Sequence, residues 1–241
     1  MVWTQCIESR PFAEHRLVCF PHAGGSPYFY RGWGKALEEF EAHTVCYPGR
    51  AERMAESPAT DLKAMARQIA ASIRPLVESR PTVFFGHSMG AIVAYETACA
   101  LEEDGAGATH LFASGARAPQ LMRGDAAAAA RWDDDAIVRN LVELGGTDAQ
   151  MLRNPDFLEL VMPYVGADFR MLSSYTAGER APLGCAVTAL VGTSDPRVTT
   201  EQADAWQEST RGPFRRVSLP GDHFYLAAAP PFGLVREAAT G

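Results

Sequence analysis

The sequence lacks any apolar run that approaches the roughly 18 residues expected of a membrane-spanning helix. Its N-terminal stretch, MVWTQCIESRPFAEHR, has no apolar core of the kind found in secretion signals. We therefore expect a soluble, cytoplasmic protein with no membrane partner.

An excess of positive charge is also lacking, because 22 Lys and Arg are outnumbered by 29 Asp and Glu, for a formal net charge of -7. A nucleic-acid-binding protein usually shows a basic footprint, so we expect no nucleic-acid partner. With 47% hydrophobic and 21% charged residues, the composition is that of a globular protein and excludes disordered and fibrous classes.

Paired cysteines at the spacing of a metal or redox site are absent. We interpret the five scattered cysteines as free thiols rather than disulfide partners or zinc ligands, and expect no cofactor. Internal repeats are absent as well. We therefore expect a single domain over residues 1–241. The cysteines are Cys6, Cys19, Cys46, Cys99 and Cys185.

Short runs rich in β-branched and aromatic residues predict strands, and their nearly continuous apolar character is typical of strands covered on both faces. Helical patterns lie between most of them. Apolar residues recur every three or four positions from Leu62 to Ile73, after a cap at Thr60 or Asp61. This alternation predicts an α/β fold with a mostly parallel central sheet flanked by helices. The predicted strands are residues 16–20, 43–47, 82–86, 110–114, 186–192 and 214–220.

The connection between the fourth and fifth predicted strands is far longer than a compact domain normally uses. Its segment WDDDAIVRNLVELGG begins with acidic caps and ends at Gly145 and Gly146, and NPDFLELV offers Asn154 as a cap with Pro155 at the first helical position. We expect residues 117–184 to form an inserted helical lid, with FRMLSSY returning the chain to the body.

The motif GHSMG at residues 86–90 matches the G-x-S-x-G pattern of a nucleophile elbow. The string alone is a weak signal, but it follows a predicted strand and opens a predicted helix, as such an elbow requires. Glycines on both sides would relieve a clash between the turn and the flanking elements. Ser88 is therefore a candidate nucleophile.

A serine nucleophile needs a base, and the base needs an orienting acid. In this fold the acid and then the histidine follow the serine, each beyond the carboxyl end of a later strand. Asp195 follows the predicted strand 186–192, and His223 follows 214–220. We predict that Ser88, Asp195 and His223 act together.

Other histidines and acids fit these roles less well. The side chain of His87 should point away from the neighbouring serine. His15, His43 and His110 are expected at strand starts, the wrong edge of the sheet. Asp222 would have to fold back to reach the adjacent ring, so we interpret it as a loop-stabilising residue. The non-catalytic alternative is a turn serine beside a core aspartate and a hydrogen-bonded histidine.

Acyl transfer also needs hydrogen-bond donors for the oxyanion. One candidate is the backbone N–H of Met89. The other is the N–H of Ala23, in the glycine-containing loop PHAGGSPYFY after the first predicted strand. We interpret His22 as a brace for this loop through hydrogen bonding, rather than as a base.

Five ordered stretches between about Arg16 and Leu226 resemble the type II thioesterases, free-standing editing enzymes that accompany polyketide synthases and nonribosomal peptide synthetases. The resemblance implies an α/β-hydrolase fold with a helical lid. It also implies hydrolysis of acyl groups held as thioesters on the phosphopantetheine arm of carrier proteins. The stretches read CFPHAGGSPYFYRGW, YPGRAERMAE, FFGHSMGAIVAYE, MPYVGADFRMLSSY and LPGDHFYL.

Matched residue by residue, the resemblance implies a nucleophile at Ser88, an acid at Asp195, a base at His223, and oxyanion donors at the backbones of Ala23 and Met89. It implies no metal or redox cofactor. The implied partners are acyl or peptidyl carrier proteins, and we expect the protein itself to be a monomer.

The sequence departs from the family pattern at Ala51, where a glutamate is expected, at Gly166, where an arginine is common, and at Asp222, where a glycine is frequent. Gly166 leaves the packing of the lid open. Two further groups have open roles. The apolar residues Phe157, Leu158, Phe169 and Met171 could line an acyl chamber or anchor the lid. A carrier protein could contact Arg50, Arg53, Arg117 and Arg123, unless these are ordinary solvated arginines.

Three alternatives remain at this point. A general carboxylesterase or lipase would use the same three residues on oxygen esters. A thioesterase domain cut from a synthetase would share the motifs. A catalytically silent hydrolase-like scaffold would bind a ligand or partner. The sequence identifies neither the acyl group nor the pathway.

Overall fold

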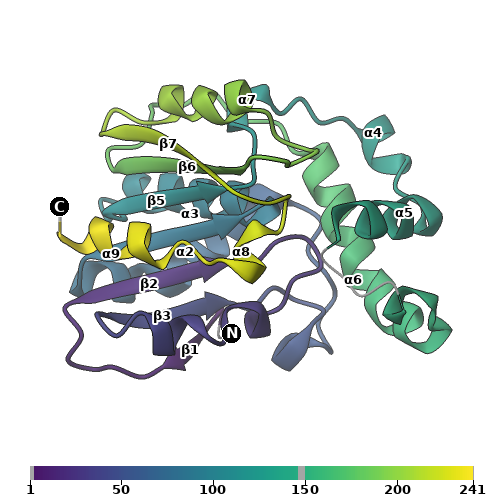
Figure 1. The fold of residues 1–241 in the computed structure, drawn as a ribbon, viewed down its shortest axis with the longest axis horizontal. Helices are drawn as coiled ribbons and strands as arrows, with labels where there is room; N and C mark the ends of the chain where they lie inside the picture. Colours follow the sequence, from purple (N-terminus) through teal and green to yellow (C-terminus); the bar gives the residue numbers. More distant parts are fainter. Residues whose placement is uncertain (1–2, 146–149, 241) are drawn as a thin grey trace.

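The computed structural model describes residues 3–145 and 150–240 and contains a seven-stranded sheet in the order β1-β3-β2-β4-β5-β6-β7. β1 is antiparallel to β3, and all the other neighbours are parallel (Figure 1). The parallel α/β architecture predicted from the sequence is confirmed. The strands are β1 (Thr4–Glu8), β2 (His15–Phe20), β3 (Phe40–Val45), β4 (Thr82–His87), β5 (His110–Ser114), β6 (Ala186–Gly192) and β7 (Phe214–Leu219).

Two strand predictions need correction. β3 begins at Phe40 rather than at His43, because Phe40 is fully buried and pairs in register with His15 of β2. β1 was missed altogether. Its residues are half-buried or exposed at the edge of the sheet, so they lack the apolar run that marked the inner strands.

Helices cover both faces of the sheet, and alternate residues of each strand pack against one layer or the other. Val18 and Phe20 belong to the cluster formed with α2 (Leu62–Ser79) and α3 (Met89–Glu103). On the opposite face, Leu17 and Cys19 join a second cluster. That cluster includes residues from α1 (Trp33–Ala36), α8 (Tyr225–Ala228) and α9 (Phe232–Thr240) (Figure 1). None of the described helices is long and apolar enough to cross a membrane.

The chain between β5 and β6 carries three helices that lie together beyond one end of the sheet (Figure 1). Their caps are those that the sequence indicates: Asp133 accepts from Ala136 N, and Asn154 accepts from Asp156 N. Gly145 ends its helix in the left-handed conformation, and Gly146 lies outside the described residues. The inserted helices are α4 (Ala126–Ala130), α5 (Asp134–Leu144) and α6 (Pro155–Ser174), and the insertion also contains the short 3-10 turns η3 (Pro119–Leu121) and η4 (Met151–Arg153).

The remaining short elements lie outside the insertion. They are α7 (Thr200–Asp204) and the 3-10 turns η1 (Pro27–Tyr30), η2 (Ala51–Arg53) and η5 (Ala205–Ser209).

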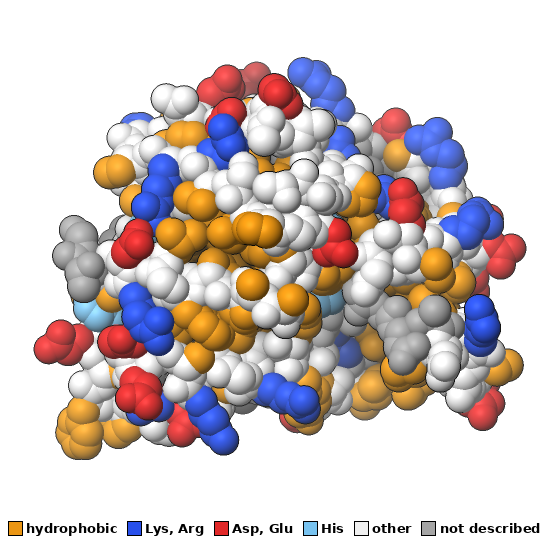
Figure 2. All heavy atoms as spheres, in the orientation of Figure 1, with side chains coloured by type: hydrophobic (Ala, Val, Ile, Leu, Met, Phe, Trp, Pro, Cys, Tyr) orange, Lys and Arg blue, Asp and Glu red, His pale blue; other side chains and the backbone are white. Residues whose placement is uncertain are grey.

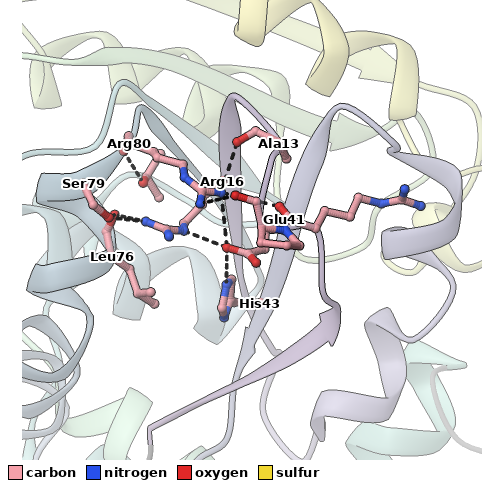
Figure 3. Close-up of polar contacts among 10 residues, drawn as sticks. Ala13, Arg16, Glu41, His43, Leu76, Ser79 and Arg80 are labelled. Carbon is pink, nitrogen blue, oxygen red and sulfur yellow. Dashed lines mark hydrogen bonds and ion pairs between the residues drawn. The ribbon is translucent and has the colours of Figure 1, made fainter.

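An ionic cluster ties β2 and β3 to the end of α2 (Figure 3). Arg16 Nε donates to Glu41 at 3.0 Å, and the Arg16 guanidinium also bonds Ser79. Arg80 and His43 lie within 3.5 and 3.6 Å of the same carboxylate. His43 is thus in the middle of β3 rather than at its start, and its imidazole belongs to this cluster.

The surface carries both signs of charge. Lys and Arg side chains are interspersed with Asp and Glu over the face shown in Figure 2, and hydrophobic side chains are visible over its middle.

A very tight turn joins β4 to α3 and carries Ser88. A Cβ on Gly86 would lie 2.3 Å from the carbonyl oxygen of Gly90, and a Cβ on Gly90 would lie 2.0 Å from that of Phe20. The two glycines therefore let the helix start against the strands, as the sequence predicts. Ser88 itself has φ 55° and ψ -121°, and its N–H donates to Ser114 O at 2.7 Å.

Gly90→Ala should destabilise the protein by about 3 kcal/mol, because the added methyl meets backbone that cannot move aside. The matched control is Gly233→Ala in α9, where a Cβ meets no atom within 4 Å and alanine favours the helix. Urea unfolding followed by circular dichroism measures both. Equal stability of the two variants would contradict the steric account of the turn.

Candidate active site

Two cavities meet at Ser88, at the carboxyl edge of the parallel strands. The larger has a volume of about 260 Å³ and the smaller about 90 Å³. Ser88 and His223 line both, together with Leu144, Phe169 and Leu172 from the inserted helices. The half-buried serine is therefore accessible from two directions.

Asp195 and His223 form a buried hydrogen-bonded pair. His223 Nδ1 lies 2.8 Å from Asp195 Oδ2, and the two side chains are 3% and 0% exposed. The second carboxylate oxygen accepts the backbone N–H of Arg197 at 2.8 Å. Because the carboxylate accepts a hydrogen bond from Nδ1–H, it fixes the tautomer in which Nε2 carries no proton and can take one from the serine.

The pair forms because the loops after β6 and β7 are packed tightly together. Ser194 N donates to Gly221 O at 2.9 Å, and a Cβ on Gly192 would lie 2.2 Å from Asp222 O. Asp222 is exposed, and its carboxylate accepts the N–H of Phe224, so it stabilises the loop as the sequence indicates.

Ser88 and His223 share both cavities, but within the described part of the chain no hydrogen bond joins their side chains. Catalytic hydrogen bonds are often long or poorly aligned without substrate and tighten when it binds. The arrangement therefore suits a proton transfer that follows a small adjustment of the site.

The two candidate oxyanion donors lie on the two segments next to Ser88's cavities and helix. Ala23 lines the smaller cavity, and Met89 is the first residue of α3, where helix geometry leaves N–H groups without partners. Neither N–H has an acceptor among the residues that the structure describes. Both are free to bind a negative oxygen.

The loop of residues 21–30, which carries the candidate donor Ala23 and is called the oxyanion loop below, is bonded to one of the inserted helices. Asp168 of α6 accepts the N–H of Gly24 at 2.8 Å and forms a two-pronged ion pair with Arg50, at 2.6 and 2.8 Å. Arg50 also donates to Gly25 O at 3.2 Å. Burial lowers the pKa of Arg50, but the Asp168 carboxylate more than offsets this, so that the pKa is raised. α6 is therefore bonded directly to the oxyanion loop.

Asp168 is a site residue that the sequence reasoning missed. It lies 1% exposed in α6 beside the buried apolar residues Val165 and Phe169. An acidic residue at a position where helical spacing predicts an apolar one was the available signal. Its partner Arg50 is far away in the sequence, so no local pattern connects the two.

The idea that Arg50 and Arg53 contact a carrier protein is wrong, because they are only 2% and 7% exposed. Arg53 donates to Glu56 and to Cys46 O. Arg117 and Arg123 are exposed and line the larger cavity. A solvated arginine and a buried ion-paired one look alike in the sequence.

The four apolar positions of the inserted helices all pack in apolar clusters. Of these, Phe157 and Phe169 also line the smaller cavity, whereas Leu158 and Met171 line neither cavity. A Cβ on Gly166 would lie 2.8 Å from the guanidinium of Arg170. The side chain of Arg170 therefore occupies the space beside residue 166, where the family commonly has an arginine.

His87 is fully buried and turned into the protein. Its Nδ1 lies 2.9 Å from Ser114 Oγ, which is in turn bonded to the hydroxyl of Tyr225. Burial and the nearby His223 hold the pKa of His87 well below its usual value. His87 is therefore neutral and engaged elsewhere, as the sequence predicts.

His22 supports the oxyanion loop through the packing of its ring rather than through a hydrogen bond of Nδ1. Its Nδ1 is buried without a hydrogen-bond partner in the described part of the chain, which corrects the predicted hydrogen-bonded brace. The ring packs edge-on against Phe29 and Phe224, and the turn is closed by Gly25 N donating to His22 O. Burial lowers the pKa of His22 to about 3, so it is neutral at pH 7.

Replacing Asp168 should separate stability from catalysis. Asp168→Leu alone leaves Arg50 buried without its partner and should cost about 3–5 kcal/mol. In the double variant Arg50→Met/Asp168→Leu, most of this stability should return because no buried charge is left. Turnover of an activated acyl ester should nevertheless stay at least about tenfold low, since Gly24 N has lost its acceptor.

Chemical denaturation and steady-state kinetics on the two variants and Arg50→Met measure these effects. Wild-type turnover in a stable double variant would show that Asp168 does not position the oxyanion loop.

The family model described as "Thioesterase domain" matches residues 15–236. The "Probable cadicidin biosynthesis thioesterase" of Streptomyces griseus is 42% identical over 212 residues, which are 88% of this chain and 58% of that relative. This chain thus spans a little more than half of that protein.

Solved structures agree with this match. The type II thioesterase BorB from the borrelidin biosynthetic cluster has a TM-score of 0.85 and 33% identity, with 99% of this chain and 98% of BorB covered. YbtT, a type II thioesterase from the yersiniabactin NRPS/PKS biosynthetic pathway, has a TM-score of 0.86 and 29% identity, with 99% and 98% covered. The family model spans nearly the whole chain, and the sheet order and elbow turn described above fit it. The chain therefore belongs to the thioesterase family, and within it to the type II thioesterases of α/β-hydrolase fold.

Proposed function

We propose that this protein hydrolyses acyl thioesters carried on the phosphopantetheine arm of carrier proteins in a polyketide or nonribosomal peptide pathway. The observation that carries this proposal is the buried Asp195–His223 pair beside Ser88, at the meeting point of two cavities. The relatives described above support the choice of substrate, because they are thioesterases of such biosynthetic pathways.

The chemistry is that of a serine hydrolase. His223 takes the proton of Ser88, whose oxygen attacks the thioester carbonyl, and the N–H groups of Ala23 and Met89 hold the negative oxygen. The thiol then leaves with a proton from the imidazolium. Water, activated by the same histidine, attacks the acyl-enzyme and releases a free acid and Ser88. Asp195 keeps the ring oriented throughout.

We assign the whole of residues 1–241 to one domain, in which residues 117–184 are the lid. The apolar lid residues exclude bulk water from the acyl-enzyme, and lid motion gates entry of the carrier arm. The bond from Asp168 to Gly24 gives such motion a direct route to the oxyanion loop.

The proposed chemistry uses only protein groups, so we propose no metal or redox cofactor. A carrier protein is the proposed macromolecular partner, and a monomer is the proposed state. We place the protein in the cytoplasm, because all five cysteines are free thiols, as expected in a reducing compartment.

The proposal is tested by loading carrier proteins with a panel of acyl groups and following each load by mass spectrometry. Wild-type protein should remove at least one load, and Ser88→Ala should be slower by about 10⁴-fold or more. Ser57→Ala is the matched control, since Ser57 is exposed and lines neither cavity.

Simple oxygen esters are assayed in parallel. A marked preference for them would favour a general carboxylesterase, which would use the same three residues. Full activity of Ser88→Ala, or no removal of any load, would contradict the proposal.

A further inference from the structure

The two cavities at Ser88 differ in chemistry. The smaller is lined mainly by apolar side chains, among them Leu141, Phe157 and Val161. The larger adds polar and charged groups from both the body and the inserted helices. These groups are Arg117, Arg123, Asn140, Ser173 and Arg197. The acyl group and the thiol leaving group of a thioester bound at Ser88 would therefore lie in different surroundings, one apolar and one polar.

Asn140 is the unusual member of the larger cavity. It is only 7% exposed, on the same inserted helix as the fully buried Ile137, and its side-chain oxygen has no hydrogen-bond partner among the described residues. Buried carboxamides in native proteins are nearly always bonded, so an unpartnered one that lines a cavity indicates a ligand.

A carboxamide offers both a donor and an acceptor, and its natural complement is another amide. An acyl-pantetheine arm carries its groups in a fixed order: a phosphate at the carrier, two amides, and then the thioester. The larger cavity is lined by a complement to each of these groups. Arg117 and Arg123 are exposed cations suited to the phosphate, the buried Asn140 suits an amide, and Ser88 is the candidate nucleophile for the thioester.

We propose that Asn140 is a positioning residue that binds an amide of the pantetheine arm in the larger cavity, which leaves the smaller apolar cavity to the acyl group. The inference rests on the proposed function. In this proposal the leaving group, which is the pantetheine thiol with its arm, contacts α5 through Asn140. α5 lies next to α6 beyond the end of the sheet (Figure 1).

The test compares two thioesters with the same butyryl group, one on pantetheine and one on ethanethiol, which has no amide. For Asn140→Leu, the ratio of kcat/KM for the pantetheine thioester to that for the ethyl thioester should fall about tenfold. This corresponds to about 1.4 kcal/mol, the size of one hydrogen bond. Because the removed side-chain oxygen has no partner among the residues that the structure describes, the thermal midpoint should not decrease.

Leu141→Ala is the control, since Leu141 neighbours Asn140 but lines the smaller cavity. It should alter both thioesters by the same factor. A ratio that stays at the wild-type value in Asn140→Leu would overturn the inference while leaving the proposed function intact. If wild-type protein hydrolyses neither thioester and also removes no load from the carrier-protein panel, the proposed function itself fails, and the inference fails with it.

Discussion

The structure depends on one close approach, that of the first turn of α3 to the ends of β2 and β4. Only glycine fits at residues 86 and 90, because backbone atoms of the neighbouring elements occupy the space of a side chain. The turn forces Ser88 into a backbone conformation that residues other than glycine rarely adopt. In this conformation Ser88 lies at the edge of the sheet where the loops after β6 and β7 carry Asp195 and His223.

A second constraint links the inserted helices to the loop that carries the proposed oxyanion donor Ala23. Asp168 reaches from α6 to the N–H of Gly24 and to Arg50, so the cover of the site and the oxyanion loop share a buried ionic contact. Separating a buried carboxylate from its guanidinium would leave two uncompensated charges out of water, which is costly in free energy. This cost holds the contact together. The inserted helices thus help to shape the site as well as to enclose it.

The sequence was sufficient for the features that parallel-sheet topology determines. The carboxyl ends of parallel strands meet at one edge, so the order of Ser88, Asp195 and His223 along the chain was enough to predict that they lie near one another. In the structure Asp195 pairs with His223, and Ser88 lines the same two cavities as His223, while the catalytic roles of the three residues stay a prediction. It was insufficient where partners are distant and leave no local pattern. The burial of Arg50 and the role of Asp168 depend on each other, and neither has meaning until the fold joins them. The edge strand β1 was missed because its half-exposed residues give no apolar run.

The most direct test of the central claim is labelling with a serine-directed fluorophosphonate, followed by mass spectrometry of the intact protein and of its peptides. The account predicts one adduct per chain, located on residue 88, with a labelling rate that falls by about 10³-fold or more in His223→Ala. A wild-type protein that stays unlabelled, a label on another residue, or an equal rate in His223→Ala would contradict it.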